Sequence, residues 1–282
     1  MKQRWARFAW TVVALLAWCG EVAGQQPLPP GISDEGSNVH YSFANLLGTG
    51  IYSLDDRTLA VFRIPISWTF REATREKFGI KLLVPTAIGF TDFDPLNNLI
   101  PTDDQFATLS VVPGIEFEYL VGKHWRVKPS VNLGFGTDLS SSEWSVIYGG
   151  GVSALRPLKA SYPEMHVGTA VVLSGYESNK SEGDFLTRWA AGLDAKFPTQ
   201  WKVADRNVFF GGHVIGYYYM NRVKFQTIVD EPIKLRAELE FGIFMGVRPA
   251  PKIFGITIDR LGIGYRFSEV SDAVIFFAGF PF

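Results

Sequence analysis

The sequence has a single cysteine, Cys19, among its 282 residues. One thiol excludes a disulfide framework and a cysteine-based zinc site. Neither sign of charge is in excess, because 27 Lys and Arg face 28 Asp and Glu, for a net charge of −1. A chain without a basic surplus lacks the electrostatic footprint of nucleic-acid binding, so we expect no nucleic-acid partner.

After residue 24 the sequence also lacks an uninterrupted apolar stretch of about 18 residues, the minimum for a membrane-spanning helix. The beginning of the chain has three parts: cations within residues 1–7, an apolar run over 8–19, and small residues at 22–24. This order is the signature of a secretory signal peptide. We therefore expect residues 1–24 to be cleaved during export, which leaves a mature chain without cysteine.

Apolar and polar residues alternate with period two from about residue 48 onwards, which predicts β-strands. The clearest alternation runs over 234–248, where the odd positions from Leu235 to Val247 are apolar and the charged residues stand at even positions. Residues 124–138 repeat the pattern. One face of each of these strands is therefore apolar over its whole length.

Two architectures contain strands of this kind. A soluble sheet buries its apolar face against a second sheet, whereas a transmembrane barrel exposes that face to lipid and turns the polar face to the lumen. Many runs exceed the roughly five or six residues of an average soluble strand and reach the roughly 9 to 11 that a tilted membrane strand needs. Aromatic residues such as Trp68, Phe70 and Trp125 stand near strand ends, where lipid headgroups favour them. We therefore predict an all-β fold, a transmembrane antiparallel β-barrel.

The alternating runs predict about twelve strands. They cover roughly 48–54, 57–70, 76–90, 105–120, 124–138, 143–156, 160–175, 185–197, 206–220, 233–248, 256–268 and 273–282. An even number suits a barrel with both ends in the periplasm. Long polar connections such as 91–104 and 221–232 then face outwards, and mostly shorter ones such as 121–123 face the periplasm, with 198–205 as an exception.

The last predicted strand has an apolar row that ends on an aromatic residue. Val274, Phe276, Phe280 and Phe282 alternate on one face. This row resembles the C-terminal signal by which the barrel assembly machinery recognises bacterial outer-membrane barrels, so we expect that machinery as a partner.

Twelve strands over residues 48–282 with a final phenylalanine resemble the autotransporter translocator barrel, in its solitary form without a passenger. The resemblance implies an outer-membrane barrel with a segment that runs through its lumen. Residues 25–47, which contain Pro27, Pro29 and Pro30, are then an N-terminal periplasmic or lumenal segment and a candidate lumen plug. The predicted organisation is a signal peptide (1–24), this segment (25–47) and the barrel domain (48–282).

If the apolar faces meet lipid, the opposite faces bring charges of both signs into the lumen. The lumen-lining candidates are Glu116, Glu118, Arg126, Lys128, Arg188, Arg236, Glu238 and Glu240. Buried charges are costly unless they are paired, which favours a salt-bridged lumen. A pore whose charged rings select ions or polar solutes is the alternative. Neither sign prevails, so no ion preference is predicted.

An outer-membrane lipid hydrolase is the competing class of function. Twelve-stranded outer-membrane phospholipases use a Ser/His pair that lies in a His-x-Ser-Asn-Gly pattern on one strand. In this sequence the resemblance to that pattern is limited to His40-Tyr41-Ser42, and the Asn-Gly that should follow is absent. We therefore expect no enzymatic activity, no catalytic residue, no metal site and no cofactor.

The sequence as a whole predicts an integral protein of the bacterial outer membrane, in contact with membrane lipid and lipopolysaccharide. Its expected role is structural or transport-related. A passive pore for small polar solutes is the alternative, and a lipid hydrolase is the third possibility.

Overall fold

The structure, a computed structural model, describes residues 47–54, 57–91, 107–139, 143–158, 162–180, 183–225, 233–253 and 256–282. The predicted signal peptide, the His40-Tyr41-Ser42 match and the 25–47 segment up to residue 46 lie outside the described residues. Among the residues that are described, no helix is long and apolar enough to span a membrane.

The described chain is built from β-strands, and their bounds follow the predicted runs closely over most of the chain. They are β1 (Thr49–Leu54), β2 (Arg57–Arg71), β3 (Gly79–Thr91), β4 (Ala107–Val111), β5 (Gly114–Val121), β6 (Trp125–Asp138), β7 (Trp144–Pro157), β8 (Glu164–Ser178), β9 (Asp184–Val203), β10 (Arg206–Phe225), β11 (Ile233–Arg248), β12 (Lys252–Ile253), β13 (Ile256–Thr257), β14 (Arg260–Phe267) and β15 (Ser271–Phe277).

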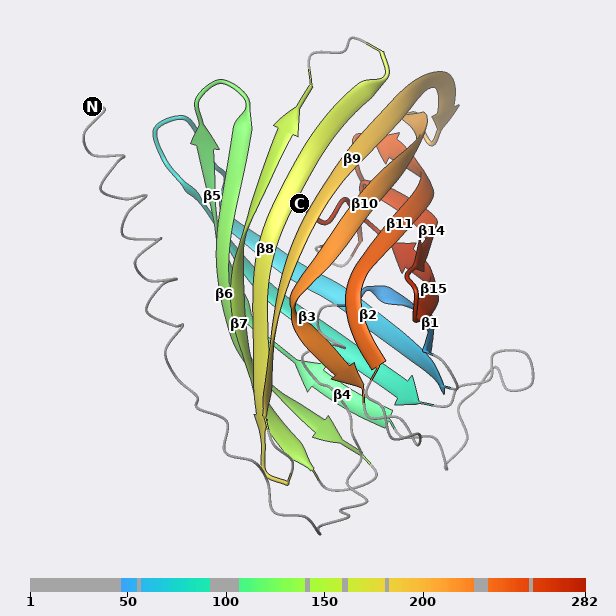
Figure 1. Ribbon diagram of the computed structural model, residues 1–282. Helices are drawn as coiled ribbons and strands as arrows, with labels where there is room; N and C mark the ends of the chain where they lie inside the picture. The colour runs from blue at the N-terminus through green and yellow to red at the C-terminus, as the bar shows by residue number, and fades with distance from the viewer. Residues whose placement is uncertain are drawn as a thin grey trace. The chain divides into compact units, whose positions relative to one another are not determined.

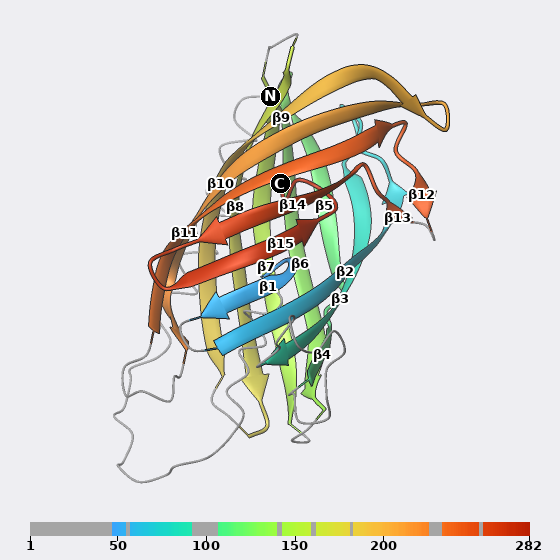
Figure 2. The ribbon, with the colours of Figure 1, turned by 90° about the vertical axis from the view of Figure 1, so that its right-hand side faces the viewer.

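The strands form one closed antiparallel ring (Figures 1 and 2). Neighbours in sequence pair with each other, and β1 pairs with β15, so the first and the last strand close the ring. Both β3 and β6 pair with β4 and with β5, which makes β4 and β5 two halves of one strand. The 13-stranded sheet is therefore a ring of twelve, as predicted, and β12 and β13 form a separate hairpin.

Strands β9 and β10 are longer than predicted, at 20 residues each. The connection expected over 198–205 is reduced to Ala204 and Asp205, whose φ angles are 48° and 61°. Two successive residues with positive φ are typical of a tight hairpin turn that follows the twist of its strands. The long connection expected at 198–205 is therefore absent, whereas the connection between β11 and β14 at the same end extends over 249–259 instead of the predicted 249–255 and contains the β12–β13 hairpin.

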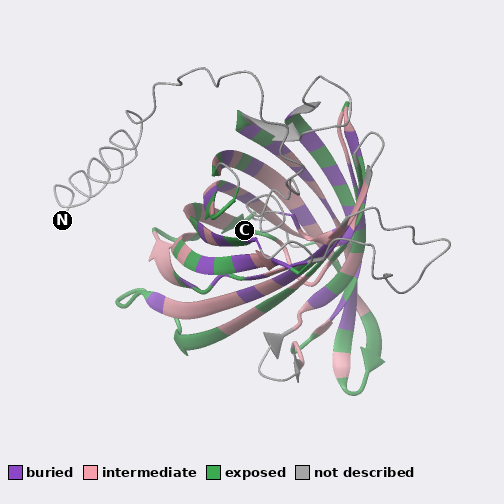
Figure 3. Ribbon diagram, turned by 90° about the horizontal axis from the view of Figure 1, so that it is seen from below, coloured by how far each residue is buried: buried purple, intermediate pink, exposed green. Residues whose placement is uncertain are grey.

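The two faces of the strands differ as the alternation predicts. On β11 the side chains of Glu238, Glu240 and Phe244 are buried, whereas Phe241 and Ile243 are 50% and 69% exposed. Figure 3 shows the same alternation of buried and exposed residues along other strands of the ring. Large apolar side chains thus cover the outer surface, and the molecule has the construction of a membrane-spanning β-barrel.

The interior contains a packed apolar cluster. Tyr52 of β1 and Val61 of β2 belong to it, together with Leu186 of β9, Ile215 of β10 and Ile275 of β15. Partly buried side chains of β7 and β8 pack against it as well. Because its members come from strands distributed around the ring, the cluster fills this part of the lumen.

Between β4 and β5 the chain bulges at Val112 and Pro113, but the ladder continues across the bulge. Val112 donates its N–H to Pro85 O at 3.1 Å, and Pro113 O accepts the N–H of Leu133 at 2.9 Å. The backbone packs closely here, since a Cβ added to Gly134 would lie 2.2 Å from Val111 O and 2.4 Å from Val112 Cα. Only glycine fits beside this bulge.

We expect Gly134→Ala to lower the free energy of unfolding by about 1–3 kcal/mol, because the added methyl group meets backbone that cannot move aside. Gly216→Ala on β10 is the matched control, since no atom lies within 4 Å of its added Cβ. Urea unfolding of the refolded barrels, followed by tryptophan fluorescence, measures both. Equal midpoints for the two variants would contradict the prediction.

Candidate functional site: the barrel interior

The interior of the barrel contains a buried network centred on the carboxylate of Glu240. Its Oε1 lies 2.8 Å from Nε2 of His213, and its Oε2 accepts hydrogen bonds from Tyr217 Oη at 2.9 Å and from Arg266 Nη2 at 2.7 Å. Every one of these residues is less than 10% exposed. Four side chains from β10, β11 and β14 thus share one paired charge system, which is the arrangement that makes buried charges tolerable.

Glu238, two residues earlier on β11, extends the network along the barrel. It accepts a hydrogen bond from Tyr219 Oη at 2.6 Å and one from Ser271 Oγ at 3.3 Å, and it lies 3.8 Å from Arg266 Nη1. We call these seven residues the central network: His213, Tyr217, Tyr219, Glu238, Glu240, Arg266 and Ser271. Glu238 and Glu240, two of the predicted lumen-lining candidates, both lie in this buried network.

A second group of charges lies nearer the short-turn end of the same strands. Arg260 binds Asp194 through both of its terminal nitrogens, at 2.5 and 3.4 Å, and His166 Nδ1 lies 3.7 Å from the same carboxylate. Arg248 binds Glu164 in the same bidentate way, at 2.8 and 2.7 Å. Charges of both signs again pair across different strands.

Aromatic rings connect the two groups of charges. The guanidinium of Arg260 lies 4.2 Å above the Phe244 ring, and Phe244 stacks at 6.4 Å on His213 of the central network. The His213 ring also contacts Phe277 at 4.6 Å. The lumen on the side of β8 to β15 is therefore filled by alternating ion pairs and rings.

The chain beyond β15 turns into the lumen, which corrects the predicted strand over 273–282. The strand ends at Phe277, and Phe282 is 5% exposed in the same interior cluster as Tyr52 and Ile275. The figures agree that the C-terminal end of the chain lies within the ring of strands (Figures 1 and 3). We call residues 278–282 the inward segment.

Two glycines of the opposite wall make room for the inward segment. A Cβ added to Gly168 of β8 would lie 2.4 Å from Phe282 Cγ, and one added to Gly192 of β9 would lie 3.1 Å from Phe282 Cε2. The Phe282 ring also packs at 4.9 Å against Phe280, whose ring lies 6.1 Å from that of His213. The inward segment therefore docks between β8, β9 and the central network.

This geometry changes the predicted row of assembly-signal residues. Val274 and Phe276 face outwards, with 38% and 50% exposure, but Phe280 belongs to the partly buried residues that pack on the interior cluster and Phe282 to the cluster itself. A single lipid-facing row that ends on Phe282 is therefore wrong. A role of these residues in recognition by the assembly machinery stays a prediction.

The other predicted lumen residues fall into two sets. On the side of β3 to β6, Lys81 pairs with Glu116 at 3.3 Å and Arg126 pairs with Glu118 at 3.4 Å, with the Arg126 side chain 58% exposed. Lys128 on β6 is half-buried. On β9, the guanidinium of Arg188 lies 4.8 Å above the Tyr217 ring. The β3 to β6 side of the lumen is thus the less tightly packed one.

Arg236 differs from its predicted place. Its side chain is exposed, while the fully buried residue at this level of β11 is Leu235. The pairing of β10 with β11 shifts register between Tyr218 and Val223, which breaks the alternation next to this point. A bulge of this kind reverses the faces of the residues beside it.

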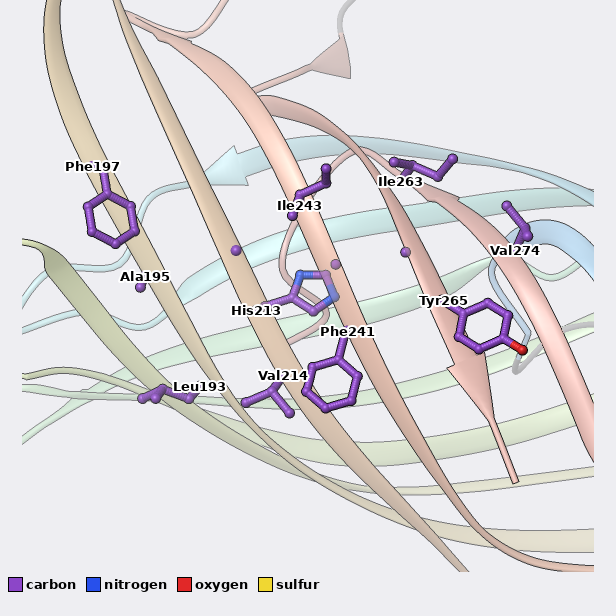
Figure 4. Close-up of a pocket in the computed structure, with 13 residues that line it drawn as sticks. Leu193, Ala195, Phe197, His213, Val214, Phe241, Ile243, Ile263, Tyr265 and Val274 are labelled. Atoms are coloured by element: carbon purple, nitrogen blue, oxygen red, sulfur yellow. The ribbon is translucent and has the colours of Figure 1, made fainter. Parts of the chain in front are cut away.

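A depression of about 630 Å³ lies on the outer face of the barrel, over β9, β10, β11, β14 and β15 (Figure 4). Leu193, Val214, Phe241, Tyr265 and Val274 form one row of it, each paired with the next across the strands. Among the described residues, no group of three or more His, Cys, Asp or Glu is placed to hold a metal ion. Apart from His213, whose side chain belongs to the central network, the lining of the depression is largely apolar and lies on the outer face of the barrel.

Comparison with known proteins gives little at the level of sequence. No family model and no curated protein matches the chain. Among solved structures, the β domain of the Bordetella autotransporter BrkA matches with a TM-score of 0.41 and 11% identity, over 82% of this chain and 96% of that chain. The closed ring of twelve antiparallel strands follows from the strand pairing of this chain itself.

Proposed function

We propose that the protein is an integral barrel of the bacterial outer membrane whose lumen is closed at rest, with a structural or translocator-like role. The observation that carries this proposal is the filled interior, where the central network and the inward segment occupy the lumen between β8 and β15. The apolar outer surface supports the membrane location. In this placement the short turns face the periplasm, and phospholipid and lipopolysaccharide surround the barrel.

A closed lumen is favoured over a passive pore because the interior charges are engaged with one another. Glu240 binds three side chains and Asp194 binds two, so these carboxylates are not available to coordinate a passing solute. A pore needs charged groups that a solute reaches and leaves again. The partly exposed ion pairs between β3 and β6 favour the pore as the second candidate.

The 25–47 segment is an additional closing element in this proposal. Leu47, the last residue of the segment, is fully buried in the interior cluster. This burial supports a path of the chain out of the lumen and into β1. The absence of enzymatic activity belongs to the proposal as well, and a lipid hydrolase stays the third candidate.

We expect the refolded full-length protein to show no stable conductance in planar bilayers. The variant that lacks residues 25–46 should also be silent or show only brief openings, because the central network and the inward segment stay in place. Single-channel recording tests both proteins. Stable conductance of the full-length protein would favour the pore, and stable conductance of the shortened variant alone would identify residues 25–46 as the main plug.

A further inference from the structure

The end of the barrel with the short turns has an exposed basic rim. It consists of the exposed cations Arg71, Arg75, Lys77, Lys123, Arg156 and Lys202. They stand at the turns or strand ends that join β2 to β3, β5 to β6, β7 to β8 and β9 to β10, which share the upper end of the molecule in Figure 1. The exposed acids of the described residues at this end are Glu72, Glu76 and Asp205, so cations prevail.

The sequence of the connections between the other strand ends has the reverse charge. Each of the connections 55–56, 92–106, 139–143, 179–183, 226–232 and 268–270 contains at least one acid, and Lys180 is the single cation among them. The two sets of connections therefore differ in the sign of their charge. A random distribution of the nearly balanced charges of this chain would leave both ends close to neutral.

Aromatic side chains hold part of the basic rim in place. The guanidinium of Arg71 lies 4.2 Å above the Phe78 ring, and its Nε donates to Phe78 O at 2.8 Å. Arg156 lies 5.6 Å above the ring of Trp125. Rings of this kind settle at the boundary between acyl chains and headgroups, so they place these cations at the level of the lipid phosphates.

From the charge and the level of these side chains, we infer that the basic rim binds the phosphate groups of anionic phospholipids in the leaflet at the short-turn end. Juxtamembrane cations attract anionic headgroups, and each contributes a separate electrostatic increment. The inference rests on the membrane placement proposed above. It adds a lipid class to that placement.

The test compares lipid selectivity in bilayers. The refolded full-length protein is reconstituted into phosphatidylcholine vesicles with spin-labelled phosphatidylglycerol or phosphatidylcholine, and electron paramagnetic resonance measures the immobilised fraction of each. We expect a several-fold preference for phosphatidylglycerol at low salt, which declines as added salt screens the rim. Arg75→Gln, Lys77→Gln, Lys123→Gln and Lys202→Gln combined should bring the preference close to one.

Lys77→Gln and Lys180→Gln are the matched single variants. The first removes one rim cation and should lower the preference by less than twofold, a smaller loss than in the combined variant, whereas the second lies in an acidic connection and should leave it unchanged. Millimolar inorganic phosphate should not compete, which separates a lipid headgroup from a free anion as the ligand. Effective competition by phosphate would overturn the lipid assignment.

If the inserted wild-type protein immobilises phosphatidylglycerol and phosphatidylcholine equally, the inference is wrong. An acidic periplasmic protein would then be the partner to test. Failure of the membrane placement looks different, because the protein would then not insert and would immobilise neither lipid. The salt dependence of the wild-type preference keeps the test decisive if the combined variant does not fold, because a salt-independent preference contradicts an electrostatic rim.

Discussion

Replacement of both Phe280 and Phe282 by alanine should convert a silent barrel into one that conducts ions. The two rings occupy the space between the central network and the wall at Gly168 and Gly192. We expect no neighbouring side chain to fill this space in the variant, because Gly168 and Gly192 of the wall have no side chains. The expected result is frequent long openings in planar bilayers, where the wild-type protein shows none.

The same variant should lose stability, because Phe282 is almost completely buried among apolar residues. Truncation of a buried phenylalanine to alanine costs about 3–5 kcal/mol through lost contacts and the cavity left behind. Urea unfolding measures this loss.

Phe276→Ala is the control for the conductance of this variant. It also removes a phenylalanine ring, but this ring belongs to β15 and lies on the outer face of the barrel, where Phe276 is 50% exposed. This variant should stay silent. If the double variant folds and is silent too, the inward segment is not what closes the barrel, and the central network or the 25–47 segment closes it instead.

The sequence was sufficient to predict the architecture because alternation is a local property. The alternation within one strand distinguishes its apolar face from its polar face. The run from Leu235 to Val247 therefore identifies the outward face of this strand without information on the adjacent strands. The number of strands follows from the number of runs. Closure follows because a long strand with one lipid-facing side and open edges is not stable in a membrane.

The inward segment lay beyond such reasoning. Phe280 and Phe282 continue the alternation of β15, so the local pattern is the same for a strand and for a turn into the lumen. The deciding feature is the space left by Gly168 and Gly192, two glycines far away in the sequence. Arg236 was misplaced for a related reason, since the register shift beside it arises on the neighbouring strand β10.

The candidate site was predicted in its composition but not in its pairing. The period of two assigned Glu238 and Glu240 to the lumen, yet their partners stand on other strands. Arg260 was missed because the predicted strand over 256–268 has apolar Ile256 and Ile258 at the same parity as Arg260, whereas in the structure β14 begins only at Arg260. Pairing depends on register between strands, and a single sequence does not contain it.

Glu240→Leu should be the most damaging single change in the central network. It removes one buried charge and leaves the Arg266 guanidinium, which is 4% exposed, with Glu238 at 3.8 Å as its remaining ionic partner. An uncompensated buried charge costs about 3–5 kcal/mol. We expect a loss of this size in the free energy of unfolding of the refolded barrel, measured by urea titration.

Glu118→Leu is the matched control for Glu240→Leu. It also breaks one glutamate–arginine pair inside the barrel, but its partner Arg126 is 58% exposed and regains water, so the expected loss stays below about 1 kcal/mol. Glu240→Leu combined with Arg266→Met and Glu238→Gln should recover much of the stability, because no carboxylate or guanidinium of the central network is then left without its ionic partner. Equal losses for Glu240→Leu and Glu118→Leu, without recovery in the triple variant, would show that the central network is as hydrated as the β3 to β6 side. The lumen would then be open to water along its whole wall, and the passive pore would become the better explanation of this barrel.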